Sequence, residues 1–165
     1  MTKSKKPIYI PDIEILADGR GEQRFRADHI VIDRDDEASF IGFADSEPAT
    51  IHSLLLLWPV DGIESPDDLY VEFNDQTNGR RGDAVTLTLR RNSLSVDYIE
   101  GADDAIVSGR VSYEESVDPM RDDPDYETEP IHRVTVFFRL SDETFESLSA
   151  ELRGLAARGI AVTFD

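Results

Sequence analysis

The chain contains no cysteine, which excludes disulfide bonds, thiolate zinc sites and cysteine nucleophiles. Histidine is scarce too, with His29, His52 and His132 the three in the sequence, and none has the spacing of a metal motif. Glycine-rich phosphate loops and the GxSxG elbow of serine hydrolases are also missing. We therefore expect no metal, no cofactor and no enzymatic activity.

Basic residues are few: Lys and Arg together number 17 against 35 Asp and Glu, which gives a formal net charge of −18. Such a charge repels nucleic acid and anionic membranes, and it attracts a basic partner and speeds its approach. Lysine occurs only at positions 3, 5 and 6, so the acidity has a second explanation in the background composition of the genome. Both explanations stay open at this point.

Long apolar runs are missing as well. The longest, LLLLWPV at residues 54–60, is too short to cross a bilayer, and the N-terminus lacks the apolar stretch of a secretory signal. We expect a cytoplasmic protein that does not bind membranes. Residues 1–6 are expected to be a disordered tail, and residues 7–165 a single globular domain.

Alternation of apolar and polar residues recurs along the chain, which is typical of strands with one buried face. Turn residues such as Asp-Gly, Ser-Pro and Asn-Gly separate these segments, so strands that follow one another should pair as antiparallel hairpins. The pattern predicts a β-rich α+β fold with a mainly antiparallel sheet. The expected strands are residues 8–16, 25–33, 39–44, 53–58, 69–73, 84–90, 94–99, 105–113, 133–140 and 160–164.

One helix is expected near the C-terminus. It should begin after Ser141, with Asp142 and Glu143 in the first turn, where carboxylates suit the helix dipole. Phe145, Leu148, Leu152 and Leu155 then share one face. Gly159 is placed to end the helix in a left-handed conformation.

Residues 114–130, EESVDPMRDDPDYETEP, break all periodicity with eight acidic residues and three prolines. This composition predicts an exposed acidic loop, and long loops of this kind are commonly functional or disordered. Either a partner-binding segment or a connector without a partner fits the pattern. The candidates for partner contact are Asp118, Asp122, Asp123, Asp125 and Glu127, with Tyr126 as a possible aromatic anchor.

The polar loop NDQTNGRRGD at residues 74–83 suggests calcium binding, but position twelve from Asn74 is Val85, where an EF-hand needs a glutamate. Asn74, Asp75 and Asn78 are better explained as turn residues. The pairs Arg80-Arg81 and Arg90-Arg91 should lie over about 20 Å apart along a strand, too far for one basic patch. We expect them to balance nearby acidic residues.

Three motifs in a fixed order resemble a known family. Gly-Phe-Ala-Asp at residues 42–45 follows an acidic turn, Glu-Phe-Asn-Asp-Gln occupies residues 72–76, and a late strand leads into the Leu-rich helix. Over residues 25–155 the chain is similar to the immunity protein 10 family of bacterial polymorphic-toxin systems. The first 24 residues, the acidic segment 114–130 and the last strand extend beyond the family pattern.

The resemblance implies a small protein that binds a cognate toxin domain, occludes its active site and catalyses no reaction. The acidity would suit a basic, nuclease-like toxin, although association rate gains more than affinity from such charge. Another class of function fits the β-rich composition: a module that binds a small molecule or carbohydrate in an aromatic-lined pocket, without catalysis. Oligomeric state is open.

Overall fold

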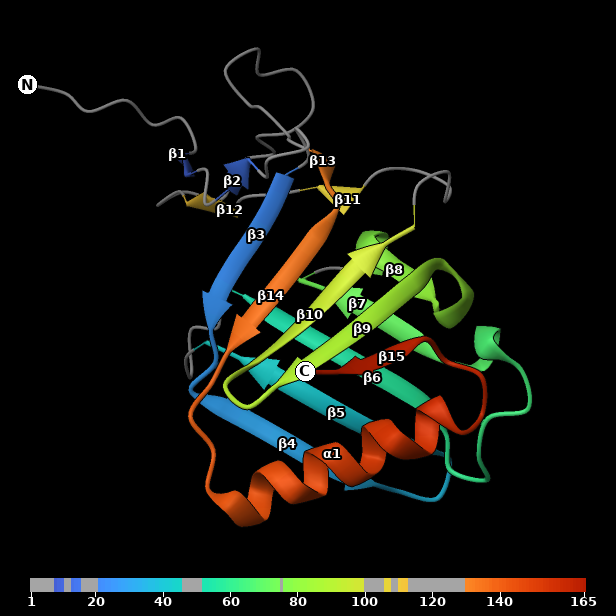
Figure 1. Cartoon of the computed structure of the whole chain (residues 1–165). Coiled ribbons are helices and arrows are strands. Elements are labelled where there is room, and N and C mark those ends of the chain that lie inside the picture. Colours follow the sequence, from blue (N-terminus) through green and yellow to red (C-terminus); the bar gives the residue numbers. More distant parts are fainter. Residues whose placement is uncertain are drawn as a thin grey trace, which may run out of the picture.

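The computed structural model describes residues 8–10, 13–15, 21–45, 52–74, 76–99, 106–107, 110–112 and 130–165. Two large sheets form its two layers, and their strands cross at a steep angle (Figure 1). The expected β-rich α+β fold, mainly antiparallel with one helix near the C-terminus, is confirmed.

The five-stranded sheet is an antiparallel meander of neighbouring segments in the order β4-β5-β6-β7-β8. Short connections of this kind favour hairpins, as the sequence predicts. Its strands are β4 (His29–Arg34), β5 (Ala38–Ala44), β6 (Ser53–Pro59), β7 (Tyr70–Phe73) and β8 (Gly79–Arg81).

The six-stranded sheet has the order β15-β9-β10-β14-β3-β2 and is mixed. Two of its pairs, β14 with β3 and β15 with β9, are parallel, which pairing by neighbouring hairpins does not predict. Its strands are β2 (Ile13–Ile15), β3 (Gly21–Arg26), β9 (Val85–Arg90), β10 (Ser93–Tyr98), β14 (Arg133–Phe137) and β15 (Val162–Phe164).

Four further short strands form two-stranded sheets, β1 (Ile8–Ile10) with β12 (Arg110–Ser112) and β11 (Ile106–Val107) with β13 (Pro130–Ile131). Three short 3-10 turns lie in connections: η1 (Pro66–Asp68), η2 (Gln76–Asn78) and η3 (Gly82–Ala84). Through η3 the chain passes from β8 in one large sheet to β9 in the other.

The expected strand 25–33 is wrong as a single element, because the chain turns a corner at Ala27 and Asp28 and changes sheets there. The corner is fixed from both sides: the Ala27 amide donates to the Phe137 carbonyl of β14 (2.8 Å), and the Asp28 amide donates to the Ala44 carbonyl of β5 (2.9 Å). The corner therefore holds the two layers together.

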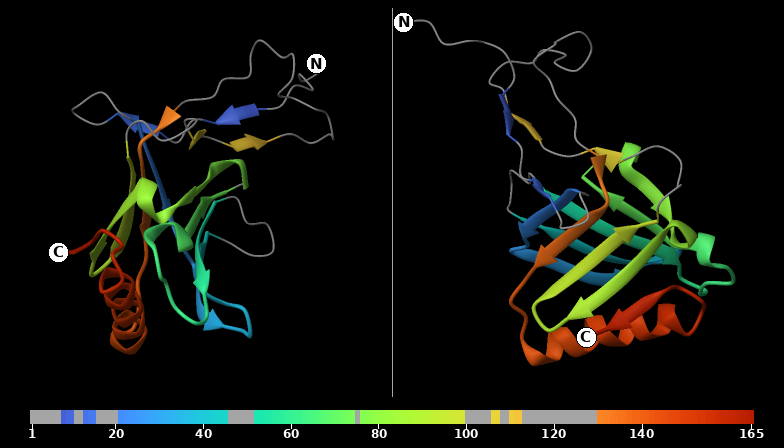
Figure 2. Two further views of the ribbon diagram at one scale, coloured as in Figure 1. Left: turned by 90° about the vertical axis from the view of Figure 1, so that its right-hand side faces the viewer. Right: turned by 45° about the horizontal axis from the view of Figure 1, so that its top comes forward.

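Helix α1 (Asp142–Ala156) begins and ends as expected. The Ser141 hydroxyl accepts a hydrogen bond from the Thr144 amide (3.1 Å), and Gly159 adopts a positive φ of 99°. Leu148, Leu152 and Leu155 are buried, so the amphipathic face meets the core. The helix lies at the lower end of the molecule, beside the six-stranded sheet (Figure 2).

The hydrophobic core fills the space between the two sheets because each strand turns alternate side chains inward. The five-stranded sheet contributes Ile41, Phe43, Leu54, Leu56, Val71 and Phe73, and the six-stranded sheet contributes Phe25, Leu87, Leu94, Val96, Val134 and Val136. The remaining alternate positions face outward.

Candidate functional site

The six residues predicted to contact a partner, Asp118, Asp122, Asp123, Asp125, Tyr126 and Glu127, lie outside the described residues. The expected tail at 1–6 and Asp75 lie outside them as well. The described surface offers another candidate site. Its two outward sheet faces have opposite chemical character.

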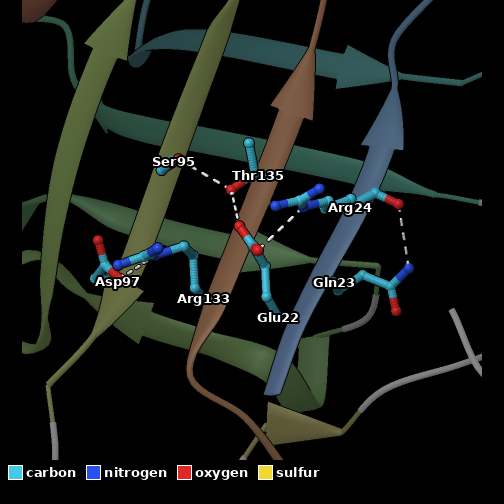
Figure 3. A network of polar contacts seen from close by, with 7 residues as sticks. All are labelled: Glu22, Gln23, Arg24, Ser95, Asp97, Arg133 and Thr135. Atoms are coloured by element: carbon cyan, nitrogen blue, oxygen red, sulfur yellow. Dashed lines mark hydrogen bonds and ion pairs between the residues drawn. The ribbon is translucent and has the colours of Figure 1, made fainter. Parts of the chain in front are cut away.

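The outward face of the six-stranded sheet carries a polar network that crosses β3, β14 and β10 (Figure 3). Thr135 donates to Oε2 of Glu22 (2.6 Å), its Oγ1 lies 2.9 Å from Oγ of Ser95, and Nε of Arg24 donates to Oε1 of Glu22 (3.0 Å). Glu22 is 3% exposed, Ser95 4% and Thr135 5%. A buried carboxylate needs such partners, so the network serves stability.

Arg133 and Asp97 extend the polar face along the same strands, with Nε 2.6 Å from Oδ1. These two strands, β14 and β10, are antiparallel neighbours with Arg133 directly opposite Asp97. These polar groups pair within the chain, and the same face also carries Phe137, which is 37% exposed and whose ring centroid lies 6.0 Å from the Arg24 guanidinium.

The outward face of the five-stranded sheet is apolar instead. Register places its side chains in two rows that run across the strands: Val31–Gly42–Leu55–Glu72–Gly79 and Asp33–Phe40–Leu57–Tyr70–Arg81. We call Val31, Phe40, Gly42, Leu55, Leu57 and Tyr70 the apolar face. Val31 is 49% exposed and the other five are partly exposed.

No helix of the described part covers the apolar face, because α1 lies at the lower end of the molecule, where Glu151 pairs with Arg34 of β4 (Figure 2). Contiguous exposed apolar surface on a protein of this size commonly marks an interaction site. A face built from the middle of strands is also rigid, so it can present side chains in fixed positions.

Gly42 leaves a gap at the centre of the apolar face. Val31 and Leu55 flank it on the neighbouring strands, and Phe40 and Ala44 flank it along β5. A Cβ at Gly42 would meet no atom of the described residues within 4 Å. The gap is therefore open to an incoming side chain.

Gly79 ends the row that contains Gly42, and Tyr70 of the second row fills the space above Gly79, where any Cβ would overlap the Tyr70 ring. The Tyr70 hydroxyl donates to Oε1 of Glu72 (2.7 Å), and the Arg81 guanidinium lies 5.3 Å from the Tyr70 ring centroid. These contacts fix the aromatic ring and one carboxylate at the margin of the apolar face.

Acidic residues surround one end of the five-stranded sheet. Asp33 ends the second row, and the β4–β5 turn and the segment after β6 add four more exposed carboxylates; we call Asp33, Asp35, Asp36, Glu37 and Asp61 the acidic rim. The Val60 amide donates to the Glu37 carbonyl (3.0 Å), which joins the two segments. The rim places negative charge directly beside apolar surface.

Asp35 shapes the turn within this rim. Its Oδ1 accepts hydrogen bonds from the amides of Ala38 and Glu37, both at 2.8 Å. These two hydrogen bonds hold the pKa of the Asp35 carboxyl below its ordinary value, and the bond from Ala38 has the larger effect. Asp35 therefore stays ionised at neutral pH.

Titratable groups inside the protein have structural roles. Nδ1 of His52 lies 2.8 Å from Oδ2 of Asp45, and the ring stacks on Phe25 at 5.5 Å between centroids. Burial raises the pKa of Tyr98, although Arg80 acts in the opposite direction, so the phenol is neutral at physiological pH. The described residues contain no group of three His, Asp or Glu side chains suited to hold a metal ion.

The turn interpretation of the loop after β7 is confirmed where the loop is described. Asn74 has a positive φ of 63° and its Oδ1 accepts from the Ser53 amide (2.8 Å), while Nδ2 of Asn78 donates to the Phe73 carbonyl (3.0 Å). Arg90 and Arg91 balance acidic residues as expected, pairing with Asp165 and Asp142. Arg81 stacks on Tyr70 instead.

Comparison with known proteins adds no relative: no family model, curated protein or solved structure matches the chain. Among the described residues, no helix has the length and apolar character needed to span a membrane. The candidate site rests on the geometry of the apolar face and the acidic rim.

The sequence contained two signals for this site. The run LLLLWP over β6 is apolar at both alternating positions, which indicates a strand with apolar side chains on both faces. The acidic turn at residues 33–37 precedes the Gly-Phe-Ala-Asp segment at residues 42–45, but its composition alone predicts no contact role for it. Neither signal shows which strands lie beside each other.

Proposed function

We propose that the protein is an immunity protein that binds a cognate bacterial toxin domain in the cytoplasm and occludes its active site. The single observation that carries this proposal is the apolar face beside the acidic rim, over which no element of the described chain lies. Protein interfaces combine an apolar centre with a polar margin, and this surface has both. The order of the three sequence motifs, which resembles that of the immunity protein 10 family, supports the same proposal.

Charge supports a basic toxin as the partner. The chain carries a net charge of −18, and the acidic rim concentrates five carboxylates next to apolar surface. A cationic protein would be steered toward this rim and would then bury the apolar face. Protection of the host cell follows if the bound protein covers the toxin's active site.

Co-expression tests the proposal. If the gene beside this one encodes a secreted protein with a toxin domain, that domain is the probe, produced in cells with and without the protein. We expect growth to be restored when the protein is present, and a complex to be recovered from those cells. Equal killing in both cultures, with no complex at low salt, would overturn the proposal.

Charge reversal tests which acidic segment meets the toxin. The variant Asp36→Lys, Glu37→Lys, Asp61→Lys changes the rim, and Asp122→Lys, Asp123→Lys, Asp125→Lys makes the same charge change in the acidic segment. Asp35 is left intact because it holds the turn. If the rim steers binding, the first variant slows association more and weakens its salt dependence more than the second.

A further inference from the structure

We infer that the Gly42 gap receives a single apolar side chain of a cationic partner protein, which makes Gly42 the specificity-determining position of the apolar face. This inference rests on the proposed function and adds a defined anchor to it. Interfaces commonly depend on a few side chains that enter pockets near the centre of the contact. The gap has that position on this face.

The strand register places an apolar side chain on each side of Gly42. Opposed residues on neighbouring strands have Cβ atoms about 4.5–5.5 Å apart. A row of Val31, Gly42 and Leu55 therefore has two apolar walls with an empty position between them. The space has the width of one side chain.

The backbone conformation does not require glycine at position 42. Its φ is not positive, in contrast to Gly62 and Gly159, and a Cβ would meet nothing within 4 Å among the described residues. Glycine in a strand interior weakens the strand and often marks the close approach of another group. No described part of this chain fills the position, so the position can receive a group of a partner.

Charge decides between a second copy and another protein. Two copies, each at −18, would repel one another as their apolar faces met. A cationic partner has the opposite charge to the acidic rim, which lies at the end of the same face. The occupant is therefore an apolar side chain on a basic protein.

A space-filling variant tests the anchor. Gly42→Ile places a β-branched side chain in the gap, where the strand backbone tolerates it, so the melting temperature should be unchanged or higher. Affinity for the toxin domain of the proposed function should fall by about tenfold or more, measured by isothermal titration calorimetry. Unchanged affinity of a folded Gly42→Ile variant would overturn the inference.

A second variant separates the anchor from charge. Val31→Asp removes one wall of the gap and makes the protein more acidic, and Val31 is already 49% exposed, so the fold should persist. Electrostatic steering alone predicts equal or tighter binding of a basic toxin, whereas loss of the anchor wall predicts weaker binding. Equal or tighter binding of the toxin domain by the Val31→Asp variant would overturn the inference that the gap receives an anchor side chain.

The matched control is Thr88→Ile, which adds apolar volume to the outward face of the other sheet at a partly exposed position of β9. It should leave affinity unchanged, and a loss equal to that of Gly42→Ile would overturn the placement of the interface.

Sedimentation of the wild-type protein alone should show no self-association through the apolar face. Self-association abolished by Gly42→Ile would show that a second copy is the occupant and overturn the assignment.

Failure of the inference is distinguishable from failure of the proposed function. If the wild-type protein neither protects cells nor binds the toxin domain, the proposed function is overturned and the anchor with it. If the wild-type protein does both and the Gly42→Ile variant does both equally well, the anchor alone is wrong.

Discussion

The outward faces of the two sheets differ in whether their side chains find partners within the chain. On the six-stranded sheet, Glu22 is bound by Thr135 and Arg24 and is almost fully buried. On the five-stranded sheet, Val31 and Leu57 lie partly exposed with no element of the described chain over them. One face stabilises the fold, and the other remains available for binding.

This difference follows from the strand connections. The polar face joins β3 and β14, which are parallel neighbours from opposite ends of the chain, so side-chain bonds between them tie together segments far apart in sequence. The apolar face belongs to a meander whose strands already pair with their chain neighbours. Its outward side chains are therefore less constrained by folding and can be selected for contact with a partner.

The largest expected effect lies on the polar face. Thr135→Val preserves shape but removes the hydroxyl that donates to the buried Glu22 carboxylate, so the free energy of unfolding should fall by about 1–3 kcal/mol. Urea denaturation measures this change. Thr88→Val, on the same face at a partly exposed position, is the control and should stay within about 0.5 kcal/mol. Similar values for both would mean that the network does not stabilise the fold.

Two glycines on the outward side of the five-stranded sheet, Gly79 and Gly42, should respond with opposite signs. Gly79→Ala displaces the Tyr70 ring and its hydrogen bond to Glu72, and should cost about 1 kcal/mol. Gly42→Ala meets open space and should stabilise by about 0.4–1 kcal/mol, because alanine restricts the unfolded chain. Thermal unfolding of the pair checks the prediction. A loss of stability at Gly42 would show that the gap is not open.

Much of this fold could be predicted from local pattern. Period-two alternation located most of the strands in the two large sheets, and Ser141 and Gly159 correctly placed the ends of the helix. The corner at Ala27 was missed although a signal exists. The apolar side chains that meet the core shift from odd numbers, Phe25 and Ala27, to even numbers, Ile30 and Ile32, and this change of phase marks the turn between sheets.

The candidate site was harder to predict because it depends on contacts between distant segments. Glu22 and Thr135 are separated by 113 positions, and no local pattern indicates that they meet. The gap at Gly42 depends on the register of β4 and β6 on either side of β5, which sequence alone does not fix. Sequence reasoning instead chose the acidic segment 114–130, where composition alone gives a clear signal.

The smallest expected effect concerns the acidic rim. The pKa of Asp35 is lowered by amide hydrogen bonds from Ala38 and Glu37, so its contribution to stability is present above its ordinary pKa of 3.8 and is lost as pH falls through the lower folded-state value. Asp35→Asn should therefore be slightly less stable than wild type at pH 6, and the difference should shrink in acid, below about pH 4. Urea midpoints measured across this range give the difference.

The control for this last change is Asp36→Asn, which removes the same charge from the same turn without removing a bond to the backbone amides of Ala38 and Glu37. If both variants show the same pH dependence, the effect comes from net charge and not from the shape of the turn. A difference confined to Asp35→Asn would show that the rim is built by specific bonds. The negative charge beside the apolar face would then have a fixed position, as recognition of a basic partner requires.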